Sequence, residues 1–162
     1  LTINSGSIDI LMSYEGLEAK ELIINDGNIS ITSSDDGINT IDSSFIGSNM
    51  KNDESILTIN GGTLLAGGSS MMALLPSDTS KVNSLMIDAS NDTQIQDEEG
   101  NVVFTYSSEK GYENLVIASN KLETGKTYTI IQGGIEVSTV TITSLQTNLS
   151  AKQNNQFQQR PK

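Results

Sequence analysis

The sequence predicts an all-β fold in which a three-faced parallel β-helix ends in an antiparallel β cap. The first observation is a 21-residue unit, Leu1 to Glu21, that is written again as Leu22 to Asp42 without a gap. The second is that apolar residues alternate over short stretches within each copy, which indicates strands and not helices. Self-similarity at a fixed period is typical of repeats that bury their apolar faces against their neighbours.

Each unit contains three short alternating stretches, around residues 1–3, 8–10 and 17–19 in the first copy. Turns that contain glycine separate them, so one unit describes one coil with three strands. Asn4 and Asn25 would then lie above one another, where a ladder of side-chain amides can form. The glycines that follow them, Gly6 and Gly27, suit a turn that needs a positive φ.

A third copy begins at Leu57 with the sequence LTINGGTLLAGG. It starts 35 residues after Leu22, which is one period of 21 plus an insertion of 14 near residues 43–56. Insertions in stacked repeats emerge as loops, often on the binding face. This segment, which includes Lys51, is predicted to be a surface loop that is either merely tolerated or used for binding.

The repeat fades after the third copy, and the rest of the chain predicts a cap and a tail. Met71, Met72, Leu74 and Leu75 form an apolar cluster that could seal the stack. Residues 1–78 are therefore assigned to the coils, 79–146 to the antiparallel cap that hides the last open edge, and 147–162 to a flexible tail rich in Gln and Asn. The strands predicted for the cap are Ser84–Ala89, Thr93–Asp97, Val102–Tyr106, Asn114–Ala118, Thr127–Gln132 and Ile135–Thr143.

Composition excludes several classes of function. The chain has no Cys and no His, which removes thiol catalysis, zinc fingers and Ser-His machinery. A net charge of −11 opposes binding to nucleic acid. No apolar run approaches the roughly 20 residues that span a membrane as a helix. An acidic polysaccharide would also be repelled unless a cation stood between it and the protein.

The strongest candidate site is the turn that contains Asp35, Asp36 and Asn39. The repeat places Tyr14 beside Asp35 and Glu15 beside Asp36, so three carboxylates meet at one edge of the stack. Such a group is repulsive unless it is protonated or bridged by a cation, and Ca²⁺ accepts oxygen ligands in irregular geometry. The alternative is that Asp-Asp-Gly is simply a turn sequence. The spacing does not match an EF-hand loop.

Several motifs resemble one known family. They are the repeated I-N-x-G-x-I-x-I units, SSDDGIN at 33–39, INGGTLLAGGSSMM at 59–72 and KLETGKTYTIIQGG at 121–134. Together, over roughly residues 1 to 140, they resemble bacterial extracellular carbohydrate-binding proteins that are related in fold to family 9 pectate lyases. The resemblance implies a right-handed parallel β-helix, secreted or attached to the cell surface, that binds plant cell-wall polysaccharide with calcium held in its turns. It also implies further coils before residue 1.

The resemblance also implies a ligand set. In the related lyases calcium is held by an Asp-Asp pair, a third Asp three residues on and an Asp one coil back. Matched by motif, these positions are Asp35, Asp36, Asn39 and Glu15. Asn39 stands where the lyases have Asp, which removes one charge and predicts weaker binding or a shifted set of ligands.

The sequence thus predicts a calcium-dependent protein that binds a pectin-like or cellulose-like polysaccharide, with Tyr14 and Lys51 as sugar contacts. The chain has no Trp and only 4% aromatic residues, which favours an acidic ligand over cellulose. Two alternatives stay open: a polysaccharide lyase, for which Lys20 and Lys51 are the basic residues expected near the corner, and a structural adhesin-like repeat. Self-association through an exposed first coil is a further expectation.

Overall fold

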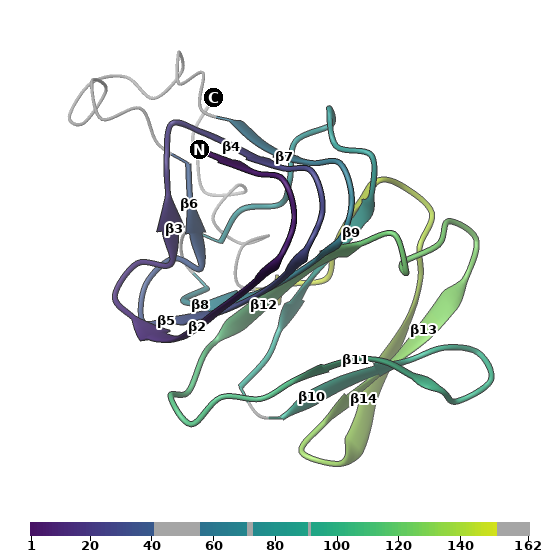
Figure 1. Ribbon diagram of the computed structural model, residues 1–162. Helices are drawn as coiled ribbons and strands as arrows, with labels where there is room; N and C mark the ends of the chain where they lie inside the picture. Colours follow the sequence, from purple (N-terminus) through teal and green to yellow (C-terminus); the bar gives the residue numbers. More distant parts are fainter. Residues whose placement is uncertain (41–55, 71–72, 91, 152–162) are drawn as a thin grey trace, which may run out of the picture.

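The computed structural model describes residues 1–40, 56–70, 73–90 and 92–151. Every regular element in these residues is a strand, and the strands form four sheets (Figure 1), none of them closed. The prediction of an all-β fold is therefore confirmed. The insertion predicted near residues 43–56 lies outside the described residues except for Ile56. The methionines of the predicted apolar cluster, Met71 and Met72, also lie outside them.

The repeat units pair with one another in parallel, side by side, as three nested arcs (Figure 1). Ile3 pairs with Ile24, and Ile24 pairs with Ile59, which is the register that the sequence repeat predicts. Equivalent strands of the units pair in three sets, namely β1 (Thr2–Ile3), β4 (Glu21–Ile24) and β7 (Ile56–Ile59); β2 (Ser7–Ser13), β5 (Asn28–Ser33) and β8 (Thr63–Gly68); and β3 (Leu17–Glu18) and β6 (Ile38–Asn39).

The first turn of each unit is held by the predicted amide ladder. Asn25 Nδ2 donates to Asn4 Oδ1 at 2.8 Å, and Asn60 Nδ2 donates to Asn25 Oδ1 at 2.9 Å, so the ladder runs through all three units. The glycine two residues after each Asn has a positive φ, which is 105° at Gly6 and 121° at Gly27. The sequence prediction for this turn is confirmed.

The sheet that contains β2, β5 and β8 continues beyond the repeats. β12 (Asn114–Ser119) pairs antiparallel with β8, β9 (Asn83–Asp88) pairs with β12, and β15 (Gln146–Asn148) pairs in parallel with β9. The result is one six-stranded sheet in the order β15-β9-β12-β8-β5-β2. Strands assigned to the predicted cap thus extend the same sheet that the repeats form.

The prediction of a flexible tail that starts at residue 147 is wrong for the first residues of that segment. Thr147 and Asn148 belong to β15, and Ser150 Oγ donates to Asp88 Oδ1 at 2.5 Å, so this part of the chain is tied to β9. Hydrogen bonds between backbones hold such a segment whatever its composition, which is why the scarcity of apolar residues was misleading. Residues 152–162 of the expected tail lie outside the described part.

The remaining strands form a separate antiparallel sheet in the order β11-β10-β13-β14. Its strands are β10 (Thr93–Gln96), β11 (Val102–Tyr106), β13 (Thr127–Gln132) and β14 (Ile135–Thr141). The bounds of β11 and β13 are those predicted from alternation, and the other cap strands differ by one or two residues at their ends. The antiparallel pairing of the predicted cap is confirmed.

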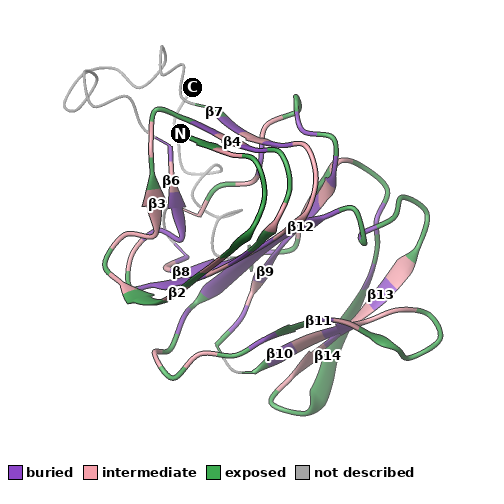
Figure 2. Cartoon of the chain, in the orientation of Figure 1, coloured by how far each residue is buried: buried purple, intermediate pink, exposed green. Residues whose placement is uncertain are grey.

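The six-stranded sheet separates two hydrophobic cores. Met86 and Val116 point into the core of the repeats, whereas Leu85, Leu115 and their alternating neighbours point into the core under the four-stranded sheet. Successive residues of a strand face opposite sides, so strands with both faces covered are buried along their length. Figure 2 shows this for β12, of which every residue is buried.

Tyr106 joins the two parts of the molecule. From β11 its hydroxyl donates to Ile31 O at 2.6 Å and lies 2.7 Å from Thr32 Oγ1, both on β5. Gly67 on β8 makes room for this ring, because a Cβ there would overlap the tyrosine hydroxyl. The tyrosine side chain is almost wholly buried, so both of its hydrogen bonds are shielded from water.

Candidate functional site

The predicted site residues that the structure describes lie on two stacked turns, one after β2 and one after β5, except Asn39, which lies in β6. The amide of Asp35 donates to Tyr14 O at 2.9 Å, and the amide of Gly16 donates to Asp36 O at 2.9 Å. These bonds place Tyr14 beside Asp35 and Glu15 beside Asp36, as the repeat predicts. The turns approach closely because a Cβ at Gly16 would overlap the backbone of the turn below. We call these two turns the acidic corner.

The carboxylates of the acidic corner are partly withdrawn from water. Asp36 is only 4% exposed, and its Oδ1 has no hydrogen-bond partner in the described residues. Glu15 is half-buried, and its Oε2 is likewise buried with no partner among them. A buried carboxylate oxygen without a partner costs free energy as long as the group is ionised. Two such oxygens on neighbouring turns mark a place where a proton or a cation is needed.

The pKa values of these groups move in the direction that burial and crowding demand. Burial, and then the nearby charges of Asp35 and Glu15, raise the pKa of Asp36 to about 6. The pKa of Glu15 is raised by its burial and by the negative charges of Asp35 and Glu18, while a hydrogen bond with the Asn39 side chain partly opposes this rise. The corner therefore resists holding all its negative charges at neutral pH.

Tyr14 lies on the solvent side of the acidic corner. Its side chain is 70% exposed, and its hydroxyl forms a hydrogen bond with the Asp35 carboxylate. That bond and the negative charge of Asp35 raise the pKa of the phenol, so the hydroxyl keeps its proton. An exposed aromatic ring with an oriented hydroxyl can contact the face of a ligand and hydrogen-bond its edge.

The side chains of the corner and of Asn39 carry the kinds of oxygen ligand that calcium binds, but they are not arranged as a complete coordination shell. Glu15, Asp35, Asp36 and Asn39 supply the carboxylate and amide oxygens that Ca²⁺ accepts, and two of the carboxylate oxygens have no partner among the described residues. No group of three or more acidic side chains in the described ranges is arranged closely enough to hold a metal ion. A cation here would have to draw these side chains together or complete its shell with water or ligand oxygens.

A basic side chain reaches the acidic corner from a distant part of the chain. Lys110, in the segment between β11 and β12, donates from Nζ to Ser13 O at 2.6 Å, directly before Tyr14. No local pattern points to this residue, because it meets Ser13 only through the packing of the two sheets. Lys20 follows β3 and is exposed, and Lys51 lies outside the described residues.

The first repeat unit presents an open edge beside the corner. β1, β2 and β3 are each the outer strand of their sheet. A bulge between Ile10 and Ser13 turns Leu11 and Met12 outward, and these side chains are 74% and 68% exposed. Self-association through this edge stays a prediction.

No family model, curated protein or solved structure matches this chain. The resemblance to carbohydrate-binding proteins related to pectate lyases therefore depends on the sequence motifs alone. None of the described segments is a helix long and apolar enough to cross a membrane.

Proposed function

We propose that this protein is an extracellular carbohydrate-binding protein that recognises acidic, pectin-like plant cell-wall polysaccharide through calcium at the acidic corner. The observation that carries the proposal is a pair of buried carboxylate oxygens on neighbouring turns, Glu15 Oε2 and Asp36 Oδ1, that have no hydrogen-bond partner in the part of the chain that the structure describes. A cation bound by these oxygens would offset the repulsion between a chain with a net charge of −11 and a polyanionic ligand. The exposed Tyr14 adds a ligand-facing surface beside them.

The same proposal includes the finer architecture. Parallel pairing of three successive units, each with strands on up to three faces around one core, supports a right-handed parallel β-helix. In such a stack, equivalent turns of successive coils lie in rows. A row of this kind brings side chains 21 residues apart into one site, as the ladder of Asn4 and Asn25 illustrates.

Each residue of the corner has a separate task in this proposal. Asp35, Asp36 and Glu15 would hold Ca²⁺ together with the side-chain oxygen of Asn39. When bound, calcium supplies positive charge that protein and uronate carboxylates can share. Tyr14, held by its hydrogen bond to Asp35, would lie against the sugar ring. Lys51, predicted as a sugar contact, lies outside the described residues.

A polysaccharide lyase is the second candidate, and Lys110 is the observation that favours it. A lyase needs a base within hydrogen-bond reach of the proton that it removes. Lys110 brings an amine to the corner, but its Nζ is directed at the backbone and donates to Ser13 O at 2.6 Å. The arrangement therefore suits a residue that attracts a polyanion better than it suits a general base. A structural adhesin-like repeat would need neither the lysine nor the unpartnered carboxylates.

Thermal unfolding with and without calcium tests the proposal. Calcium at 100 times its dissociation constant should stabilise the native protein by about 2.7 kcal/mol. We expect Asp36→Ala to lose this increment, while Asp78→Ala, at an exposed residue outside the corner, keeps it. Calcium increments that are equal in the wild type and in Asp36→Ala would contradict a metal site at the corner.

Sedimentation with insoluble polygalacturonate tests the ligand. Binding should require calcium, disappear with EDTA and be weaker for Tyr14→Ala. In the same mixtures the absorbance of unsaturated products should stay flat, and a rising trace would identify a lyase instead. A protein that binds calcium but no polysaccharide would support the structural alternative.

A further inference from the structure

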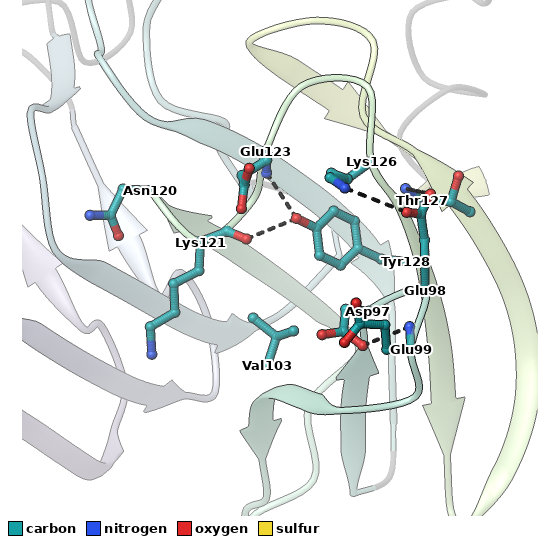
Figure 3. A pocket seen from close by; sticks show the side chains of 10 residues that line it. All are labelled: Asp97, Glu98, Glu99, Val103, Asn120, Lys121, Glu123, Lys126, Thr127 and Tyr128. Carbon is teal, nitrogen blue, oxygen red and sulfur yellow. Dashed lines mark hydrogen bonds and ion pairs between the residues drawn. The ribbon is translucent and has the colours of Figure 1, made fainter.

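A cavity lies apart from the acidic corner, at one end of the four-stranded sheet. It has a volume of about 500 Å³ and opens between the turn that follows β10 and the loop between β12 and β13 (Figure 3). This volume is within the range of about 300 to 1,000 Å³ that small-molecule sites occupy. None of its lining residues belongs to the acidic corner.

The walls of the cavity are fixed by hydrogen bonds. The Tyr128 hydroxyl donates to Lys121 O at 2.8 Å and accepts from the amide of Glu123 at 2.9 Å, which fastens the loop to β13. On the opposite side, Asp97 Oδ1 accepts from the amides of Glu99 and Asn101 at 3.0 and 2.8 Å. The cavity is thus built on two braced turns, and such bracing lowers the cost of ordering the backbone around a ligand.

Some charged side chains at the cavity are not used in this bracing. In the described part of the chain, neither the carboxylate of Glu123 nor the ammonium of Lys121 takes part in a hydrogen bond or an ion pair. Glu99 accepts only a long bond of 3.4 Å from Asn101. Figure 3 shows Glu123 and Glu99 on opposite sides of the Tyr128 ring. Among the described residues, two carboxylates and one ammonium group that line the cavity are therefore not engaged in its bracing.

The balance of charge selects the kind of ligand. The lining contains four carboxylates and two ammonium groups, namely Asp97, Glu98, Glu99, Glu123, Lys121 and Lys126. Four minus two leaves a net charge of −2, and one carboxylate is already paired because Lys126 Nζ lies 3.7 Å from Glu98 Oε2. A ligand must therefore bring positive charge and hydrogen-bond donors.

The carboxylates are too dispersed for a single metal ion. Over the residues that the structure describes, no three acidic side chains come together as a metal-binding group. The carboxylates of the cavity are therefore distributed around it and do not converge on one ion. Lys121 and Asn120 add donors at the same opening, and a hydroxyl group can accept from them while it donates to a carboxylate.

We propose that this cavity binds a small organic cation that carries a primary ammonium group together with hydroxyl groups, which is the chemistry of an amino sugar. The ammonium group lies between the carboxylates of Glu99 and Glu123. The hydroxyl groups meet Lys121 and Asn120. This site does not depend on calcium or on the acidic corner, so it can exist whether or not the proposed function is correct.

The test is an NMR titration of the isotope-labelled full chain in EDTA with glucosamine, and with glucose as the uncharged partner of the same shape. We expect glucosamine to shift amide signals of residues 97–103 and 120–128, while glucose at equal concentration leaves them unchanged. Glu123→Gln and Glu99→Gln should each weaken the binding of glucosamine at least tenfold. Glu136→Gln, which removes an exposed carboxylate from β14, should leave it unchanged.

Two results would overturn the proposal. The first is an equal response to glucose and glucosamine, which would show that the ammonium group is not recognised. The second is a response to glucosamine that is spread over the acidic surface and is weakened equally by Glu136→Gln and Glu123→Gln, as expected for a loose counterion. The amide spectrum of each free variant shows whether it is folded, so a misfolded variant is not counted as a loss of binding.

Discussion

At the scale of single residues, the ionised carboxylate of Asp36 is the group of the acidic corner whose burial most disfavours the folded state. Its carboxylate is nearly inaccessible, one of its oxygens is unpartnered in the described region, and two other carboxylates are near. A pKa that is raised in the folded state means that folding favours the protonated form. The native state then binds more protons than the unfolded state between the two pKa values, and stability falls as pH rises through this window.

The first prediction concerns this pH dependence, measured by urea unfolding in EDTA. Burial raises the pKa of Asp36 from 3.8 to about 6, so the wild type should gain stability as pH falls from 7 toward 4. Asp36→Asn removes the ionisable group and should be more stable than the wild type by about 1 to 2 kcal/mol at pH 7. The difference should shrink toward pH 4.

Asp78→Asn, at an exposed position before β9, is the control for this experiment, and we expect the same pH profile as in the wild type. A gap between Asp36→Asn and the wild type that is constant with pH would contradict a titrating Asp36. In millimolar calcium the advantage of Asp36→Asn should decrease or reverse, because the cation then neutralises the wild-type carboxylate.

The residues that the sequence could locate are those related by the repeat. Glu15 and Asp36 were matched by counting 21 positions, and the backbone bond from the Gly16 amide to Asp36 O joins the same two turns. Lys110 could not be found in this way, because 97 residues separate it from Ser13 and no periodicity connects them. The cavity around Glu99 and Glu123 was not predicted either, because in the sequence its acidic turn resembles an ordinary solvated turn.

At the scale of elements, the amide ladder makes the middle repeat unit depend on both of its neighbours. Asn25 donates one bond and accepts another, whereas Asn4 takes part in only one of the two that the ladder contains. Hydrogen bonds of this kind contribute about 0.5 to 1.5 kcal/mol each, with exposed ones at the low end. The position in the row therefore decides how much each amide contributes.

The second prediction compares two alanine variants of the ladder. Asn25→Ala should lower the free energy of unfolding by about 1 to 2 kcal/mol, and Asn4→Ala by about half of that amount, because one bond is lost instead of two. Urea unfolding at fixed pH measures both values. Equal losses, or a larger loss for Asn4→Ala, would show that the ladder does not act as a row of independent bonds.

Alternation located most strands but not their partners. β11 and β13 were predicted with their observed bounds, because polar and apolar residues alternate and glycine or acidic turns bound them. That β12 would lie between β8 and β9 was not predictable, since pairing across separate parts of a chain leaves no local pattern. β15 was missed because its few residues are polar and are held by backbone pairing with β9 and by a hydrogen bond from Gln146 Nε2 to Pro76 O, which leave no apolar pattern.

At the scale of the whole molecule, Tyr106 connects the four-stranded sheet to the second repeat unit. Its hydroxyl is shared between Thr32 Oγ1 and Ile31 O, inside the contact of the two parts. Removal of a buried hydroxyl leaves the partner groups without a replacement, which costs about 1 to 3 kcal/mol. The connection is thus a measurable coupling between regions that are 74 residues apart.

The third prediction is a double-mutant cycle across this contact. Tyr106→Phe should destabilise the protein by about 1 to 3 kcal/mol, and Thr32→Val by a smaller amount. The two losses should not add, and a coupling energy of about 0.5 kcal/mol or more is expected for residues that share a hydrogen bond. Strict additivity in urea unfolding would show that the Thr32 hydroxyl does not contribute through Tyr106.

The sheet that the two cores share has a consequence for how the molecule comes apart. In a plain array of repeats each unit touches only its neighbours, and units can melt one after another from either end. Here the third unit is anchored, because β8 pairs with β12, which is buried on both faces. Loss of structure should therefore start at the first unit, and backbone amide exchange should slow steadily from β2 through β5 to β12. The acidic corner is built from the first and second units, which lie farther from this anchor than the third.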